Sequence, residues 1–413
     1  TTFHRKNYYY PDLPKNFQLT QYDAPICQQG SLEISVEGNR REIGITRAHL
    51  EEDPGSLQHK GGSIDTAEAT LINYNRAGTP LVEIVTEPDF RSPAETRAFL
   101  AKLEGVLDYL GVFDSTRDGS LRVDANISLV DADEVDEDGS IPDDALAEAN
   151  RTEVKNISSH KGAEKALAYE VTRQKNAVRR GRGVETETRH WDESRGITVS
   201  MRSKESEADY RYFREADLPP LEVAHWKEEI PIPELPDARR ERFETEYGLD
   251  AESASKLTST KEVADFFESV AESFDADLAA TWVADNLLGE LNYRDLEITD
   301  VADRLDEFTR LIELVDGDEL TVKNAEEVVL REMLDSGDDP ETIADREGLG
   351  KADDDEITGF VTEAIQENPE AVEDYHNGED GALNFLVGQV MQKSQGSADP
   401  GSVNELLRSQ LAE

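Results

Sequence analysis

Apolar and polar residues alternate in several short runs over the first half of the chain, a pattern typical of β-strands. These runs are separated by Gly, Asn and Asp turns and lie at residues 32–36, 42–46, 121–129 and 197–201. Two helical patterns interrupt them. One opens with the capping box Ser92-Pro-Ala-Glu95, and the other begins near Ser159. We therefore expect a strand-rich domain over residues 1–220.

Proline marks the end of this domain, with Pro219-Pro220 followed by a proline-rich stretch up to Pro236. Such a stretch favours an extended linker, because proline lacks an amide donor and restricts the residue before it. Beyond it the apolar residues recur at helical spacing, and Asp316-Gly-Asp318 breaks the series. The spacing predicts helices around 237–247, 261–273, 277–291, 304–315, 322–335, 356–367, 381–395 and 402–412. We expect an all-helical domain over 221–315, a helical tail domain over 316–413, and an α+β class for the whole chain.

The charge of the chain is strongly negative, with 91 acidic and 43 basic residues and a formal net charge of −48. Residues 221–413 alone carry 51 acidic against 15 basic residues. These acids alternate with helix-period apolar residues, which argues against a disordered acidic tail. Because molar salt reduces the Debye length to about 3 Å and weakens the repulsion, we expect a salt-rich cytoplasm.

Cysteine content and the chain ends limit the possible chemistry further. The single cysteine, Cys27, excludes an intrachain disulfide and a cysteine-cluster metal site within these residues. No apolar run is long enough to span a bilayer, and no secretory signal opens the chain, so we expect a cytoplasmic protein without a membrane partner. Because the chain opens with Thr1 directly before dense motifs, we expect an N-terminal truncation.

The strongest candidate chemistry lies in His49-Leu-Glu-Glu-Asp53 and in Glu83, which interrupts the apolar run 80–85. A carboxylate in a buried strand needs a cation or water, because burying an unpaired charge is costly. Mg²⁺ commonly takes one or two protein carboxylates and fills its other positions with water and phosphate. The pattern indicates a metal and phosphate site. The alternative is that Glu83 simply points to solvent.

A phosphate group at such a site calls for nearby cations, since phosphoryl transfer depends on positioning and charge neutralisation. Arg47, Lys60 and Arg76 are available, and Arg76 is the best candidate because its planar fork can hold a phosphate through two parallel bonds. An arginine in a turn is otherwise usually just solvated. The sequence contains no Walker-type loop, which argues against an ordinary P-loop ATPase.

Seven motifs in order along the chain resemble those of the GatB family, the B subunits of aspartyl/glutamyl-tRNA amidotransferases. They are Arg5-Lys-Asn-Tyr-Tyr-Tyr-Pro-Asp12, Ile45-Thr-Arg-Ala-His-Leu-Glu-Glu-Asp53, Asn75-Arg-Ala-Gly-Thr-Pro-Leu-Val-Glu83, Arg122-Val-Asp-Ala-Asn-Ile-Ser128, Glu153-Val-Lys-Asn-Ile157, Asp209-Tyr-Arg-Tyr-Phe213 and Phe385-Leu-Val-Gly-Gln-Val-Met391. The related archaeal glutamate-specific proteins have an extra inserted domain, for which this chain has no room. The resemblance implies a cradle-like catalytic domain over 1–220.

The resemblance also implies an activity. The family uses ATP to phosphorylate the side-chain carboxylate of Glu or Asp mis-esterified to tRNA, and ammonia then displaces the phosphate to give Gln-tRNA or Asn-tRNA. The implied cofactors are ATP and Mg²⁺. The implied partners are the amidase (glutaminase), which is the A subunit and supplies ammonia through a channel, the small C subunit, and the mischarged tRNA. The sequence does not distinguish Glu-tRNA from Asp-tRNA as substrate.

Residue roles follow from the same resemblance. It assigns the metal to Glu52, with Glu51 as the neighbouring alternative, and to Glu83. The family's N-terminal Glu and His ligands and its zinc-binding cysteine cluster fall before Thr1. With Arg76, the two glutamates form the expected catalytic set.

The ammonia channel of the family maps onto Lys6, Lys15 and Asp124. The phenols of Tyr8 and Tyr10 offer hydrogen bonds along such a polar passage and are expected to bind substrate. For these two tyrosines, packing in the core or at an interface remains the alternative.

Basic groups for tRNA are scarce, and the only dense basic run is Arg173, Lys175, Arg179, Arg180 and Arg182, which is otherwise explained as a solvated helix face. The family binds tRNA with its tail domain, here the acidic residues 316–413. Two other functions stay open. One is a non-catalytic adaptor that holds tRNA and the amidase together, and the other is an ATP-dependent amide ligase that does not use tRNA.

Overall fold

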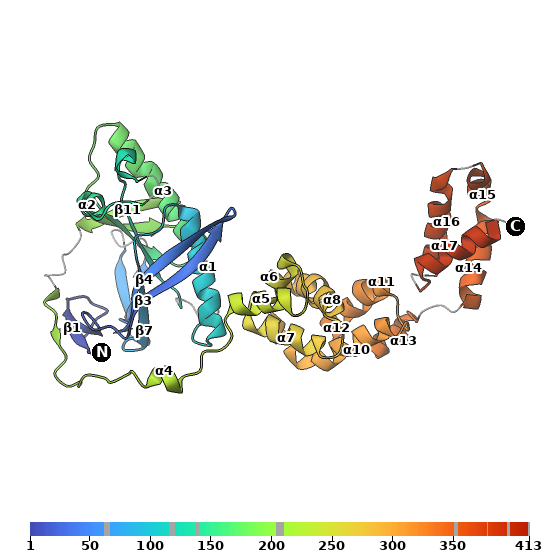
Figure 1. Cartoon of the computed structure of the whole chain (residues 1–413), viewed down its shortest axis with the longest axis horizontal. Helices are drawn as coiled ribbons and strands as arrows, with labels where there is room; N and C mark the ends of the chain where they lie inside the picture. The colour runs from blue at the N-terminus through green and yellow to red at the C-terminus, as the bar shows by residue number, and fades with distance from the viewer. Residues whose placement is uncertain are drawn as a thin grey trace. The chain divides into compact units, whose positions relative to one another are not determined.

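The computed structural model describes residues 1–61, 67–114, 120–136, 140–203, 210–350, 354–377, 379–394 and 397–411. The chain divides into two compact units, Thr1–Pro233 and Glu234–Glu413, here called the first unit and the helical unit (Figure 1). The first unit combines sheets with helices, and the second contains only helices among its described residues. This arrangement confirms the expected α+β class.

The largest sheet of the first unit has six strands in the order β12-β1-β2-β4-β3, and β7 also pairs with β4. A four-stranded sheet has the order β11-β10-β9-β8, and β5 and β6 form a separate hairpin. The strands are β1 His4–Asn7, β2 Phe17–Thr20, β3 Cys27–Val36, β4 Asn39–Glu52, β5 Ser56–Lys60, β6 Ala69–Asn73, β7 Pro80–Thr86, β8 Val123–Ile127, β9 Thr152–Ile157, β10 Glu187–Asp192, β11 Ile197–Ser203 and β12 Phe213–Arg214.

The long β3–β4 hairpin supports the largest sheet. Its turn consists of Glu37 and Gly38, both with positive φ (51° and 81°), as a tight two-residue turn requires. Ile34 of β3 and Ile43 of β4 are buried on one face of the hairpin. The alternation of apolar and polar residues along these strands therefore reflects one covered face.

Two helices complete the core of the first unit, α1 (Pro93–Tyr109) and α3 (His160–Arg179). Each is N-capped by a serine hydroxyl, since Ser92 accepts from Glu95 N and Ser159 accepts from Gly162 N. Helix α1 packs on α3 and on β3, and α3 packs against the four-stranded sheet (Figure 1). Both helices bury small and apolar side chains in one cluster with both sheets.

The first unit extends beyond the expected boundary at residue 220. Leu221 exchanges two backbone hydrogen bonds with Thr1, at 2.9 and 3.0 Å, which ties the start of the linker to the N-terminal segment. The structure therefore divides after Pro233, and the linker 221–233 includes only the short helix α4 (Trp226–Glu229).

The helical unit consists of short helices that match the expected periodic segments and add several that the sequence pattern did not reveal. Residues 281–287 and 325–329 form π-helical turns inside longer helical runs. The α-helices are α5 Pro236–Thr245, α6 Ala251–Leu257, α7 Lys261–Ala271, α8 Ala276–Ala280, α9 Leu288–Arg294, α10 Leu305–Asp316, α11 Val322–Asn324, α12 Leu330–Ser336, α13 Pro340–Glu347, α14 Asp354–Glu367, α15 Pro369–His376, α16 Asp380–Lys393 and α17 Pro400–Leu411.

The expected tail domain begins at residue 316, but the helices just after that residue pack against the helices before it. Helix α10 contacts α13, and Phe308 of α10 lines a small apolar cavity together with Leu330 and Met333 of α12. A separate hydrophobic cluster contains only residues from 357 to 411, contributed by α14 to α17. Apolar contacts thus join 316–350 to the helices before it.

None of the helices in the described parts of the chain combines the length and the apolar character needed to cross a membrane.

Candidate functional site

The candidate site lies where β4 pairs with β7 in the largest sheet. The two strands are antiparallel, and His49 is directly opposite Glu83. Successive side chains of a strand point to opposite faces, so His49 and Glu51 share one face of β4, and Glu83 lies on that same face of the sheet. The register therefore places one imidazole and two carboxylates together.

The three side chains form a compact cluster, here called the His49–Glu51–Glu83 cluster. Nε2 of His49 lies 3.4 Å from a carboxylate oxygen of Glu51 and 3.4 Å from one of Glu83. One donor atom from each residue lies within 4.8 Å of the other two, a spacing that a single metal ion can bridge. His49 is buried, whereas the Glu83 side chain is 45% exposed, so the cluster opens to solvent on the Glu83 side.

Glu51 is held in place by neighbours from β2. Gln18 Nε2 and Thr20 Oγ1 each donate a hydrogen bond to its carboxylate at 3.0 Å. Burial alone would raise its pKa, but hydrogen bonding to His49 and Thr20 and the charge of Lys6 together lower the pKa of Glu51 to about 2. Glu51 is therefore a fixed anion.

The pKa of Glu83 shifts in the opposite direction to that of Glu51. Burial and then the nearby negative charge of Glu51 raise its pKa, while His49 and Lys6 only partly offset this effect. Two carboxylates that share one site repel each other, and a cation between them would relieve that repulsion. The pair of carboxylate oxygens suits Mg²⁺, and His49 adds a nitrogen donor. The residues thus fit a divalent metal ion.

Glu52, the residue expected to meet Glu83, lies on the opposite face of β4. Its carboxylate forms an ion pair with Lys15 and accepts a hydrogen bond of 3.1 Å from the backbone N–H of Leu19. The structure therefore brings Glu51, and not Glu52, to Glu83. The physical reason is the two-residue alternation of a strand, since a shift of one residue reverses the face.

Arg76 forms an ion pair with the buried carboxylate of Asp53. Its Nη2 lies 2.9 Å from Asp53 Oδ2, and Nη2 of Arg122 lies 2.6 Å from the other oxygen, Oδ1. The Asp53 side chain is 5% exposed, whereas both arginine side chains are about half exposed. Asp53 thus anchors two guanidinium groups that remain accessible to a ligand.

The Arg76 turn is tied to the same aspartate through the backbone. Gly78, with φ of 84°, donates its N–H to the Asp53 carbonyl at 2.9 Å, and Asp53 N–H donates to Thr79 O at 2.8 Å. A side chain at Gly78 would be strained at this φ. The turn therefore fixes where the Arg76 guanidinium can lie.

Tyr8 lies near charged groups of both the cluster and the arginine pair. Burial raises its pKa, the charges of Glu51 and Asp12 raise it further, and Arg122 lowers it, so Tyr8 lies within electrostatic reach of both groups. Its ring packs edge-to-face on Tyr10 and Tyr210. Tyr10 is 39% exposed.

The residues expected along a channel lie in different surroundings. The Lys6 ammonium lies 5.0 Å from the centre of the Tyr210 ring and acts electrostatically on Glu51 and Glu83. Lys15 is paired with Glu52, as described above. Asp124 forms an ion pair with Lys155 at 2.6 Å. Each of the three charged groups therefore has an oppositely charged or aromatic neighbour that fixes its position.

The sequence motifs contain His49, Asp53 and Arg122, but they do not indicate a role for any of the three. The spacing of His49 and Glu51, two residues apart in a strand, would have placed both on one face. Their meeting with Glu83 depends on the register of β4 and β7, which the sequence pattern does not supply. Asp53 and Arg122 are 69 positions apart in the sequence, so no local sequence pattern predicts that they pair.

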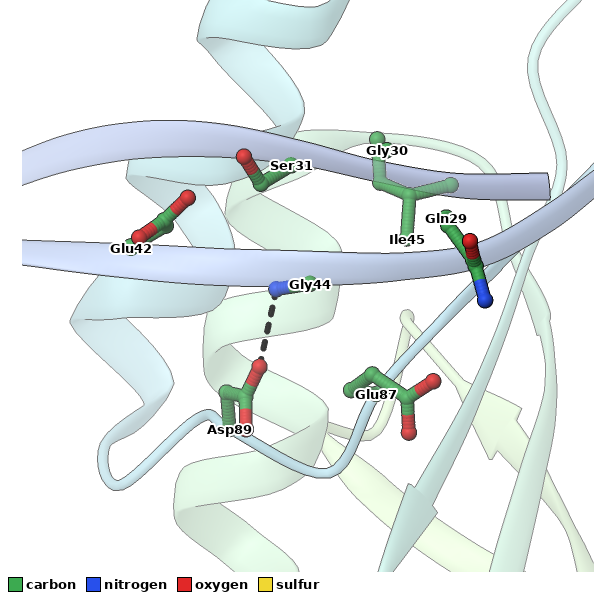
Figure 2. Close-up of a pocket in the computed structure, with 8 residues that line it drawn as sticks. All are labelled: Gln29, Gly30, Ser31, Glu42, Gly44, Ile45, Glu87 and Asp89. Atoms are coloured by element: carbon green, nitrogen blue, oxygen red, sulfur yellow. Dashed lines mark hydrogen bonds between the residues drawn. The ribbon is translucent and has the colours of Figure 1, made fainter.

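A separate shallow pocket of about 530 Å³ lies between β3, β4 and the segment after β7 (Figure 2). Its acidic side chains are Glu42, Glu87 and Asp89, and Asp89 accepts a hydrogen bond from Gly44 N at 2.8 Å. Neither arginine nor lysine lies among the described residues that line it. Because carboxylates repel phosphate, this pocket does not suit a nucleotide.

Comparison with known proteins identifies the family. Residues 1–228 match the family described as the GatB/GatE catalytic domain, and residues 265–411 match the GatB domain. The chain is 77% identical over 411 residues to a protein of Natronomonas pharaonis, covering 100% of this chain and 83% of that protein. It is 75% identical over 411 residues to one of Haloquadratum walsbyi, with the same coverage.

A more distant relative from Methanospirillum hungatei is 53% identical over 412 residues, which cover 98% of this chain and 82% of that protein. All three relatives are named as the B subunit of an aspartyl/glutamyl-tRNA(Asn/Gln) amidotransferase. Both halves of the chain match, and the aligned regions cover the strands that build the His49–Glu51–Glu83 cluster. The chain therefore belongs to the GatB family, the B subunits of the aspartyl/glutamyl-tRNA(Asn/Gln) amidotransferases.

Proposed function

We propose that this chain activates the side-chain carboxylate of Glu or Asp esterified to tRNA with ATP, and then lets ammonia displace the phosphate. The product is Gln-tRNA or Asn-tRNA. The observation that carries this proposal is the His49–Glu51–Glu83 cluster, which offers divalent-metal ligands close to accessible guanidinium groups. The names of the relatives supply the amidotransferase reaction and the tRNA substrate.

The chemistry requires activation, because a carboxylate is a poor electrophile for ammonia. In the first step a carboxylate oxygen attacks the γ-phosphorus of ATP and ADP leaves. In the second step ammonia attacks the acyl carbon, inorganic phosphate leaves, and the nitrogen loses a proton. Since an acyl phosphate hydrolyses in water, both steps need a site that excludes solvent.

The residues of the candidate site divide these tasks. His49, Glu51 and Glu83 would hold a divalent ion such as Mg²⁺, which neutralises phosphate charge when bound. Arg76 and Arg122 bind the transferring phosphoryl oxygens, and Asp53 orients both guanidinium groups. Such fixed positive groups stabilise the negative charge that develops on the phosphoryl oxygens in the transition state.

The ammonia route runs along Lys6, Lys15, Asp124 and the tyrosine pair. Tyr8 offers a hydroxyl group that interacts electrostatically with Glu51, and the Tyr10 ring packs edge-to-face against the Tyr8 ring. Ammonia comes from glutamine through the amidase, which is the A subunit, and the third partner is the small C subunit. The tail residues, within 316–413, bind the tRNA.

Substitution Glu83→Gln tests the proposal in the assembled complex. The variant keeps the shape of the side chain but removes one anionic ligand, so we expect at least a hundredfold loss of tRNA-dependent ADP formation and of amidated tRNA. Glu87→Gln is the matched control, because Glu87 lies on the acidic pocket and its amide can still accept from Thr46 Oγ1. If Glu83→Gln retained full activity, the chain would be a non-catalytic adaptor.

A further inference from the structure

Helix α3 presents a continuous basic face that the proposed chemistry does not use. Lys161, Lys165, Lys175 and Arg179 are all exposed. At 3.6 residues per turn they fall within about 80° of arc, and at 1.5 Å per residue they extend over about 27 Å. The exposed Arg180 and Arg182 continue the positive charge beyond the end of the helix.

The buried face of α3 determines where the basic face points. The buried residues of the helix include Gly162, Ala163, Ala166, Leu167 and Glu170, which pack toward the four-stranded sheet. The basic face therefore points away from the core. Between its charged ends the face carries only the exposed Ala168 and Thr172, so a large partner can approach closely.

Among the described residues, none of these four basic side chains has a carboxylate within 4.0 Å. The acidic residue at the edge of the face, Glu164, is already paired with Arg97 at 3.2 Å. The next acidic residue of the helix, Glu170, is buried and binds Arg173 and Arg189. The described part of the chain therefore leaves the positive charge of the face uncompensated.

The helical unit shows the opposite behaviour. Of its thirteen described lysines and arginines, twelve have a carboxylate within 4.0 Å, and the remaining one, Arg408, binds Asn404. In a chain with 91 acidic residues, basic groups are readily neutralised by neighbours. A stripe of basic residues about 27 Å long without such neighbours therefore contrasts with the helical unit, and an external anion would explain it.

We propose that the basic face of α3 binds the phosphate backbone of a double-helical stem of the RNA substrate. This proposal rests on the proposed function and adds a second contact with the RNA to the one proposed for the tail residues. Proteins recognise RNA duplexes mainly through shape and backbone contacts, while single strands need aromatic platforms for stacking. The face has no exposed aromatic residue, since Tyr169 at its edge packs against the core. A straight, rigid row of cations therefore suits a duplex.

An acidic protein surface is the competing partner for such a face. We favour RNA over an acidic protein, because the polyanionic RNA needs a dense group of unpaired cations. The described cations of the helical unit are already in ion pairs or hydrogen bonds, whereas those of the α3 face are not. Neutralising phosphates releases counterions, so each contact makes binding more dependent on salt. This salt dependence provides a direct readout.

The test compares two triple variants of the full chain for binding of labelled tRNA over a range of KCl concentrations. The first is Lys165→Gln, Lys175→Gln and Arg179→Gln, which preserves helix propensity. The control is Arg40→Gln, Arg195→Gln and Lys227→Gln, which removes the same charge at exposed sites elsewhere in the first unit. Circular dichroism verifies that both variants fold.

We expect the α3 variant to reduce the slope of log K against log salt by about two to three, at roughly one per lost phosphate contact, and to bind tRNA at least tenfold more weakly at the lowest salt. The control should keep the slope of the wild type. An acceptor-stem duplex should compete for the face, and a single strand of equal length should not.

Three results would overturn the proposal. They are an unchanged slope in the α3 variant, an equal loss in the control, or weakened association with the amidase at unchanged tRNA affinity. Failure of the proposed function would give a different result. The wild-type complex would then not amidate mischarged tRNA, but the α3 variant would still bind RNA more weakly than wild type.

Discussion

Asp53 is the residue on which the geometry of the arginine pair depends. Its two oxygens accept from Arg76 and Arg122, and Asp53→Asn would leave one neutral oxygen and an amide that repels a guanidinium. Hydrogen bonds to charged groups contribute about 1.5–3 kcal/mol, so we expect phosphoryl transfer to slow by roughly 10- to 150-fold. Single-turnover ADP formation measures this rate. An unchanged rate in a folded variant would show that the arginines need no anchor.

The Arg5–Glu215 ion pair predicts how stability depends on pH. Hydrogen bonding to Arg5, followed by the Asp217 N–H, lowers the pKa of Glu215 from an ordinary value of 4.5 to about 2. A lowered folded-state pKa gives stability that is fully present above about pH 4.5 and is lost as the pH falls toward 2. The pair joins β1 to the residue after β12 and so ties together distant parts of the first unit.

We therefore expect the free energy of unfolding of wild type to exceed that of Glu215→Gln above about pH 5, and the difference to shrink between about pH 4.5 and 2. Urea unfolding of both proteins at constant KCl measures this difference. A difference that is independent of pH would mean that the Glu215 carboxylate is not preferentially stabilised by folding.

At the residue scale the sequence indicates Glu83 and Arg76 as candidates but does not show which residues join them. Glu83 stands out because it interrupts an apolar run, and Arg76 because it lies beside a turn. The choice between Glu51 and Glu52 is not available from sequence, since adjacent residues of a strand face opposite sides and only the pairing with β7 decides which side matters. The metal-binding role of the cluster remains a proposal.

Helix α1 illustrates how one side chain determines where an element begins. Ser92 Oγ accepts from Glu95 N at 3.3 Å, and Glu95 in turn accepts from Arg91 N at 2.6 Å. Replacing a serine N-cap by alanine costs about 1 kcal/mol. We expect Ser92→Ala to lower the free energy of unfolding by that amount, as measured by urea denaturation. Stability equal to wild type would mean that packing alone defines the helix start.

Elements with a long periodic pattern are predicted well from sequence. Both long helices of the first unit begin where their capping residues place them, and the expected strands at 32–36 and 42–46 lie within the longer β3 and β4. The short helices α6, α13 and α15 were missed, because seven or eight residues provide two turns of pattern and their stability depends on packing. The pairing of β1 with β12 joins opposite ends of the first unit and is invisible locally.

At the scale of the whole molecule, the excess of acidic residues predicts a dependence on salt. Residues 221–413 carry 51 acidic and 15 basic residues, and twelve of the thirteen described basic residues of the helical unit are in ion pairs. The remaining carboxylates repel each other until salt screens them. This composition agrees with the relatives from halophilic archaea.

We expect the melting temperature of the full chain to rise by several degrees as KCl increases from about 0.2 M to molar concentrations, where the Debye length is about 3 Å. Circular dichroism in the far ultraviolet follows the transition, which is dominated by the helical unit. A melting temperature that falls with salt would indicate that attraction between ion pairs, and not repulsion, governs stability.

The proposed metal site depends on one pairing, in which Glu51 joins His49 and Glu83 while the adjacent Glu52 does not. The most direct measurement is Mn²⁺ binding in the presence of ATP, followed by electron paramagnetic resonance, for wild type, Glu51→Gln and Glu52→Gln. The structure predicts that Glu51→Gln abolishes binding to this site and that Glu52→Gln binds Mn²⁺ like wild type. Loss of binding in Glu52→Gln with full binding in Glu51→Gln would contradict it.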